Sequence, residues 1–288
     1  MNILNITYLL NGLLMIAMPV GLTIYLTRKH ALSWHFFWIG AGTMIFSQVL
    51  HIPFNIILNP IFSRPFIISL PIIWQTIAFA TFLGLSAGIF EELSRYIMYR
   101  WWAKDARTWG AGLVAGAGHG GIEAIILGIL VLYGYVQMMI LRGVDIASIT
   151  SPDKVEMVKV QVQTYWSAPW PMTLLGAVER LFTIPLHLAC SVLVLQTFLR
   201  KNSLWIILAI IFHALVDGLS IYMIRIGFSV FSIEVIIGIF AVFSVGIVLV
   251  LRERGQTTDL GTAIINKTEA KIKPLEDTPE NLDKTRFQ

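Results

Sequence analysis

Phe90-Glu91-Glu92-Leu93-Ser94-Arg95-Tyr96 is the stretch that decides how the rest of this chain is interpreted. It places two adjacent carboxylates and a guanidinium near the end of a run of about twenty apolar residues, which is long enough to cross a bilayer. An ionisable side chain at membrane depth costs about 2.5 to 3.5 kcal/mol on insertion scales. Because these groups are so costly to insert, they indicate a functional site within the membrane.

The composition is that of a polytopic membrane protein. Hydrophobic residues make up 56% of the 288 positions, charged residues only 13%, and the mean hydropathy is +0.74. About seven apolar runs are long enough to span a bilayer, near residues 4–27, 33–58, 69–98, 109–140, 171–199, 203–224 and 229–251. The sequence therefore predicts an all-α bundle of transmembrane helices in a multi-pass protein of the cytoplasmic membrane.

The basic residues lie between the apolar runs and not on one amphipathic face, which argues against a nucleic-acid partner despite the net charge of +4. They concentrate after the first, third, fifth and seventh runs, so the positive-inside rule predicts an outside N-terminus and a cytoplasmic C-terminus. The first run has no basic segment before it and no small-residue cleavage site after it. We expect it to be a retained helix and not a signal peptide.

The chain divides into a transmembrane domain, residues 1–252, and a polar tail, residues 253–288, whose mixed charge and lack of periodicity predict disorder in the cytoplasm. The longest connection, residues 143–168, is predicted to lie outside. Within it Ser151-Pro152-Asp153 predicts the start of a short helix, which would lie at the outer membrane interface. A solvated loop is the alternative for this connection.

Three later runs carry acids and imidazoles as well, namely His119 with Glu123, Glu179 with His187, and His213 with Asp217. Spacings of four or eight residues place the two members of each pair on one helix face. With a rise of about 1.5 Å per residue, the groups of all four runs fall at overlapping depths in the cytoplasmic half of the bilayer. One shared cluster is the simplest prediction.

Two interpretations of Arg95 are open. It lies within one helical turn of both Glu91 and Glu92, so it could form a local ion pair at the interface while its head reaches the lipid headgroups. It could instead belong to the cluster. The remaining histidines, His30, His35 and His51, receive no role from the sequence.

Glutamate beside imidazole within a membrane serves either hydrolysis by activated water or the relay of a proton or ion. For hydrolysis, histidines would act as metal ligands or as donors to the oxyanion. No His-Glu-x-x-His motif is present, so a divalent metal such as zinc would be held from separate helices by His119, His187 and His213. The single cysteine, Cys190, predicts neither an intrachain disulfide nor a thiolate metal site.

These motifs resemble those of the YhfC-like family of predicted intramembrane proteases over residues 70–225. The matching segments, in the same order, are Glu91-Glu92-x-x-Arg95, Gly118-His119-Gly120-Gly121-Ile122-Glu123-Ala124, Glu179-Arg180 with His187, and His213-x-x-x-Asp217. That family belongs to the wider group of type II CAAX prenyl proteases and bacteriocin-immunity proteins, with the PrsW proteases. The resemblance implies a peptide or membrane-protein substrate taken from the lipid bilayer.

The resemblance also implies roles for individual residues. Glu91 or Glu92 would be the general base, His119 would position water, and His213 with Asp217 would hold the oxyanion or a metal. Because the arginine of the common pattern stands one position later than Arg95, the resemblance leaves open which glutamate faces the site.

Further members of the motifs would support the site. Glu179 and His187 match an extra motif of the YhfC branch, while Arg95 and Glu123 flank the principal groups.

Two other functions are compatible with the same residues. A transporter or proton-coupled channel could use the acids and histidines to bind an ion, although the sequence has no evident inverted repeat or pair of broken helices. A non-catalytic scaffold or immunity factor could retain the cluster for binding a partner.

Overall fold

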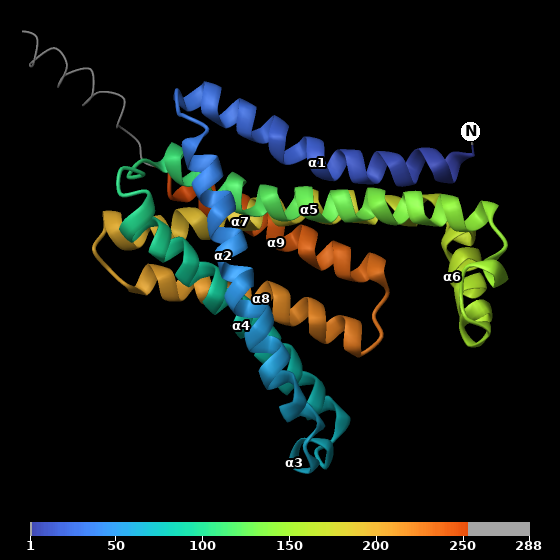
Figure 1. Ribbon diagram of the computed structural model, residues 1–288. Coiled ribbons are helices and arrows are strands. Elements are labelled where there is room, and N and C mark those ends of the chain that lie inside the picture. Colours follow the sequence, from blue (N-terminus) through green and yellow to red (C-terminus); the bar gives the residue numbers. More distant parts are fainter. Residues whose placement is uncertain (1, 253–288) are drawn as a thin grey trace, which may run out of the picture. The chain divides into compact units, whose positions relative to one another are not determined.

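The computed structural model describes residues 2–252, and every regular element in that range is helical (Figure 1). The helices are α1 (Ile3–His30), α2 (His35–Leu58), α3 (Pro65–Ile68), α4 (Ile72–Ile97), α5 (Trp109–Gly143), α6 (Val155–Ser167), α7 (Leu175–Leu199), α8 (Leu204–Arg225) and α9 (Val230–Val250). Single 3-10 turns span Asn59–Ser63, Ile146–Ser148, Pro152–Lys154 and Trp170–Leu174, and a π turn at Met98–Trp102 extends α4. The tail for which disorder is predicted, residues 253–288, lies outside the described residues.

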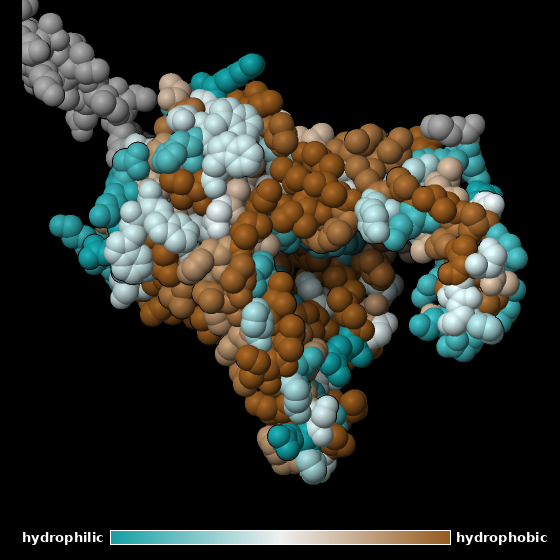
Figure 2. Space-filling view, viewed as in Figure 1, coloured by the Kyte–Doolittle hydropathy of each residue, from teal (hydrophilic) through white to brown (hydrophobic). Residues whose placement is uncertain are grey.

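Seven helices within residues 2–252 are long and apolar enough to cross a membrane, namely α1, α2, α4, α5, α7, α8 and α9. They confirm the predicted all-α, multi-pass membrane architecture. Large apolar side chains cover their outer flanks, and hydrophilic ones gather around α6 and near α3 (Figure 2). Ile57 of α2 and Val242 of α9, for example, are 72% and 73% exposed. Such a surface is suited to contact with lipid, where the helices satisfy their own backbone hydrogen bonds. Which end of each helix faces the cytoplasm stays a prediction.

The long helix α5 is central to the bundle. It packs against α1, α2 and α7, while α4 lies along α8 and α9 lies along α7. This arrangement brings α4, α5, α7 and α8 together, which are the helices whose sequences carry the ionisable groups.

Glycine allows the closest of these contacts. A Cβ atom on Gly120 of α5 would lie 2.5 Å from the His187 ring on α7, and one on Gly88 of α4 would lie 2.7 Å from the carbonyl oxygen of Ile210 on α8. Both distances are too short for any side chain, so these glycines set the separation of the helices around the cluster.

The short helix expected after Ser151 is present as α6. It is attached to the ends of two transmembrane helices, because Tyr8 of α1 donates to the Tyr165 carbonyl at 2.7 Å and the Trp166 indole donates to the Met138 carbonyl of α5 at 3.2 Å. The connection is therefore not the solvated loop that was the alternative.

Candidate functional site

Four helices contribute ionisable side chains to one cluster, as the matched depths predicted. The members are Glu91, Glu92 and Arg95 from α4, His119 and Glu123 from α5, Arg180 and His187 from α7, and His213 and Asp217 from α8. The three histidines, Arg95 and both α4 glutamates are buried. Charged groups at this depth are stable only when they are paired with each other.

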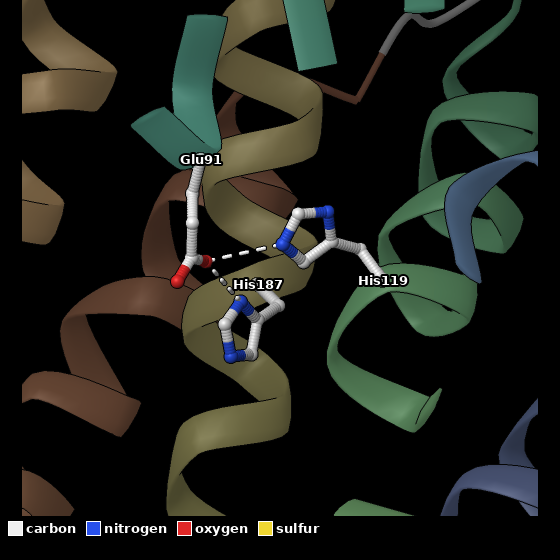
Figure 3. A group of neighbouring side chains, drawn as sticks. All are labelled: Glu91, His119 and His187. Atoms are coloured by element: carbon white, nitrogen blue, oxygen red, sulfur yellow. Dashed lines mark hydrogen bonds and ion pairs between the residues drawn. The ribbon is translucent and has the colours of Figure 1, made fainter. Parts of the chain in front are cut away.

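The carboxylate of Glu91 is at the centre of the cluster. Its Oε2 atom lies 3.1 Å from Nε2 of His119, 3.8 Å from Nε2 of His213 and 4.0 Å from Nδ1 of His187. Figure 3 shows the Glu91 side chain directed at the rings of His119 and His187, which come from two different helices. Three imidazoles therefore surround one carboxylate oxygen.

His119 has its tautomer fixed by a neighbouring hydroxyl. Thr43 of α2 donates its single hydroxyl proton to the Gly40 carbonyl at 2.5 Å, so it must accept from Nδ1–H of His119 at 2.9 Å. A neutral His119 then directs the lone pair of Nε2 at the carboxylate of Glu91. Two acceptors 3.1 Å apart require a proton or a metal ion between them.

The other two histidines are anchored by carboxylates. Nδ1–H of His213 donates to Glu92 at 2.7 Å, and Nε2–H of His187 donates to Glu123 at 3.0 Å. In each ring the second nitrogen is left on the side of Glu91. Imidazoles held through one nitrogen, with the other directed inward, are typical of metal ligands.

The donor set fits a divalent cation such as zinc, which accepts imidazole nitrogen and carboxylate oxygen. Ligand atoms of Glu91, His119 and His187 all lie within 4.8 Å of one another. Nδ1 of His187 also accepts a hydrogen bond from Arg95 at 2.8 Å, so His187 becomes a ligand only if that bond breaks. The inward nitrogen of His119, Nε2, faces only the Glu91 carboxylate among the hydrogen bonds and ion pairs of the described residues, whereas Nε2 of His213 also lies 3.5 Å from the Asp217 carboxylate.

A second donor group, formed by Glu92, Cys190 and His213, does not fit a cation. Arg95 already forms an ion pair with Glu92, and the Nδ1 atom of His213 carries the proton that it donates to Glu92. A cation there would have to displace both that guanidinium and that proton.

Arg95 is 0% exposed. Its guanidinium contacts Glu92 and His187 and lies 3.8 Å from Glu91. The alternative in which Arg95 reaches the lipid headgroups is therefore wrong, and Arg95 belongs to the cluster.

Two of the three pairs that share a helix face, His119 with Glu123 and Glu179 with His187, have other partners than each other among the ion pairs of the described residues. Glu123 lies on the same helix as His119, but its carboxylate binds His187 and, at 2.6 Å, Arg180 of α7. Glu179 forms its ion pair with the adjacent Arg180.

His213 and Asp217 do stay together, at 3.5 Å between Nε2 and Oδ2. Sequence spacing thus identified the face of each helix but not the partner of each group.

Two cavities of opposite character meet at Glu91. One, of about 740 Å³, has a mostly apolar lining from α2, α4, α5 and α8. The other, of about 190 Å³, has a polar lining that includes Glu179, Arg180, Thr183 and Ser220. Glu91, Glu123 and Asp217 line both cavities, whereas Glu92 lines neither of them.

The second helix adds residues that the sequence analysis did not place in the site. Gln48 donates to Oε1 of Glu91 at 3.2 Å, and its own amide oxygen accepts from Nδ1 of His51 at 3.4 Å. Nε2 of His51 lies 2.8 Å from the Asn55 amide and 3.0 Å from the hydroxyl of Ser86 on α4. These contacts form a hydrogen-bonded chain that connects Asn55 and His51 through Gln48 to Glu91. The signal in the sequence is a set of polar residues, Thr43, Gln48, His51 and Asn55, at near-helical spacing in an apolar run.

The family of the chain follows from comparison with known proteins. A family model described as YhfC intramembrane metalloprotease matches residues 14–240. The chain belongs to this family. A curated relative, the uncharacterized membrane protein YhfC of Bacillus subtilis (strain 168), is 30% identical over 256 residues, which cover 82% of this chain and 92% of the relative. No solved structure matches the chain.

The YhfC match is wider than the resemblance over residues 70–225, since it begins in α1 and ends in α9. It includes α2, which carries Thr43, Gln48 and His51. The relation to the type II CAAX proteases stays a prediction.

Proposed function

We propose that this YhfC-family protein hydrolyses a peptide bond within the membrane, with Glu91 as the general base. One observation carries the proposal, namely that the Glu91 carboxylate borders both an apolar and a polar cavity while three imidazoles surround its Oε2 atom. A general base must reach both water and substrate. Glu92 is fully buried and paired, so it is better suited to positioning His213 and Arg95.

The proposed reaction uses groups of the chain in two proton transfers. Water from the polar cavity gives a proton to Glu91 as its oxygen attacks the peptide carbonyl. Cations or N–H groups beside Glu91 stabilise the negative charge that develops on the oxygen of the attacked carbonyl. When the carbon–nitrogen bond breaks, Glu91 returns the proton to the leaving amine, and Asp217 beside His213 keeps that ring oriented.

The candidate ligands for a metal ion are His119, His213 and, once Arg95 releases it, His187. A zinc ion held there would polarise the carbonyl and make water a stronger acid. The family description supports a metalloprotease but does not name the metal.

The first test is cleavage of a membrane peptide by the purified protein in lipid vesicles. We expect Glu91→Gln to lower turnover by at least about a thousandfold, because an amide cannot accept the proton. Glu156→Gln is the control, since Glu156 is an acid on α6 whose ion pair is with Lys159 of the same helix, away from the cluster. Full turnover in Glu91→Gln would contradict the proposal.

The second test is elemental analysis of the same preparation beside a His119→Ala, His187→Ala, His213→Ala variant. We expect about one zinc ion per chain in the wild type and none in the variant. A folded wild type that cleaves peptide without metal would instead favour histidines as oxyanion donors.

The alternative functions predict different results in the same vesicles. A transporter would carry protons or ions across the membrane without cleaving peptide. A scaffold would lose partner binding in His119→Ala with no turnover to lose.

A further inference from the structure

The polar cavity beside Glu91 extends from the histidines toward one end of the helix bundle. On α8 its lining runs from His213 to Ser220, toward the C-terminal end of the helix. On α7, which runs in the opposite direction, the lining runs from His187 back to Glu179, toward the N-terminal end. Both directions lead to the end of the bundle at which α6 lies, the α6 side, where α7 and α9 begin (Figure 1).

The acidic side chains of the cavity become more exposed toward the α6 side. The Glu91 side chain is 8% exposed and that of Glu123 is 23% exposed. Asp217 and Glu179, which lie further along the cavity, reach 36% and 39%. A carboxylate at membrane depth is costly to expose to lipid, so this exposure is to water.

A neutral polar group in the cavity also lacks a protein partner. The side-chain oxygen of Thr183 is buried, and it has no hydrogen-bond partner among the described residues. Buried polar groups without a protein partner usually bond to ordered water. The cavity, of about 190 Å³, has room for several water molecules, each of which takes about 30 Å³ in the liquid.

The bundle is closely packed on the other side of the histidines. Val114 of α5, Val192 of α7 and Tyr99 are each 0% exposed and belong to one apolar core. The hydroxyls of Tyr99 and Ser191 lie 2.8 Å apart, and Ser191 donates to the Gly112 carbonyl at 2.8 Å. An interior packed in this way, with its polar groups paired internally, leaves no room for a chain of water molecules.

The charges along the cavity favour some solutes over others. Four carboxylates line it, against the single guanidinium of Arg180, which is itself paired with Glu123 at 2.6 Å and with Glu179. A cleft lined by acids raises the local concentration of cations and lowers that of anions. Water and small cations should therefore enter this cavity more readily than anions.

We infer that water reaches Glu91 from the α6 side of the membrane, along Glu179, Arg180 and Glu123, while the packed core closes the opposite side. With the outside N-terminus that the positive-inside rule predicts, this water comes from outside the cell, although Glu91 lies nearer to the cytoplasmic end of α4. The inference rests on the proposed function for the use of the water. Its entry is measured without any cleavage.

The test measures the labelling of cysteines by membrane-impermeant thiol reagents in sealed membrane vesicles. Cys190→Ala removes the single native cysteine, and Thr183→Cys or Ser220→Cys then places one in the lining of the cavity. Ser148→Cys, in the connection before α6, and Asn202→Cys, between α7 and α8, report which side of the membrane a reagent reaches.

The expected result is labelling from one side of the membrane. A cationic methanethiosulfonate added on the side that labels position 148 should label positions 183 and 220 at least about tenfold faster than the same reagent added on the side that labels position 202. The ratio of cationic to anionic labelling rates should be about tenfold higher at positions 183 and 220 than at position 148. Labelling only from the side of position 202, or from neither side, would overturn the inference.

Two control cysteines test entry through the lipid and through the packed core. Leu181→Cys is on α7 near Thr183, and Leu181 is 56% exposed but outside the lining of the cavity. Val192→Cys lies in the core on the other side of His187. Neither should be labelled more than about a tenth as fast as position 183. An unfolding temperature equal to that of the wild type excludes labelling of unfolded protein, and equal labelling at position 181 would overturn the inference.

The labelling pattern separates the inference from the proposed function. Labelling from the α6 side in a protein that cleaves no peptide would support the water route and contradict hydrolysis. Cleavage together with labelling only from the side of position 202 would support hydrolysis and contradict this route.

Discussion

Glu91 and Glu92 are adjacent in the chain but lie in contrasting regions of the molecule. One residue corresponds to about 100° around a helix, so the two carboxylates face different neighbours. Glu92 is 0% exposed and binds Arg95 and His213, whereas Glu91 borders two cavities. The Glu92 carboxylate, whose charge is balanced by a buried guanidinium and an imidazole N–H, stabilises the packing of the helices. The Glu91 carboxylate, which a substrate can reach, is available for chemistry.

The largest expected effect separates the two residues by activity. Glu91→Gln should abolish cleavage, as described above, yet leave the unfolding midpoint in detergent unchanged or raised. The reason is that side chains required for activity commonly lower the stability of the folded protein. A large fall in the midpoint would show that Glu91, like Glu92, is mainly structural.

The next effect separates them by stability. Glu92→Gln leaves the buried Arg95 without its nearest carboxylate, and removing one partner of a buried ion pair costs about 3 to 5 kcal/mol. Denaturant unfolding of the purified protein measures this loss. A double variant, Glu92→Gln with Arg95→Met, should recover part of the stability because it removes the unpaired charge. If Glu92→Gln unfolds like the wild type, the structural assignment of Glu92 fails.

A smaller effect concerns the groups that orient the histidines around Glu91. Thr43→Val preserves shape but removes the acceptor for Nδ1–H of His119, so zinc affinity should fall about 10- to 100-fold. Thr197→Val is the control, because its buried hydroxyl has no hydrogen-bond partner among the described residues. Titration with zinc in competition with a chelator gives both affinities. Equal affinities would mean that the hydroxyl does not orient a ligand.

The smallest effect concerns the chain of hydrogen bonds from α2. Gln48→Leu removes the donor to Oε1 of Glu91 and should lower turnover about tenfold, since a hydrogen bond to a charged group contributes about 1.5 to 3 kcal/mol. Asn55→Leu, two bonds further away, should have a smaller effect on turnover. The opposite order would indicate that α2 acts on the substrate and not on Glu91.

The membrane spans and the grouping of the ionisable residues could be predicted from the sequence, because they depend on the length of each apolar run and on the depth of each residue along it. The apolar runs gave the seven spans, and counting residues from the ends of each run placed His119, His187 and His213 near Glu91. The pairings could not be predicted in this way. Glu123 was grouped with His119 by spacing, yet it binds His187 and Arg180, because rotation of α5 against α7 decides which groups meet.

Residues of α2 were overlooked for a related reason. Threonine, glutamine and asparagine are neutral, so Thr43, Gln48 and Asn55 carry little insertion cost and give a weak signal next to a buried glutamate. Their importance arises from contact with His119, Glu91 and His51.

The sequence by itself determined that this protein is a bundle of membrane-spanning helices with acids and imidazoles at one depth, because hydrophobic length and helical rise are properties of the chain alone. Only the tertiary structure decided that Glu91 borders the cavities, that Glu92 and Arg95 are paired away from them, and that α2 joins the site. Those distinctions depend on how each helix is rotated against its neighbours, which close contacts at residues such as Gly88 and Gly120 set.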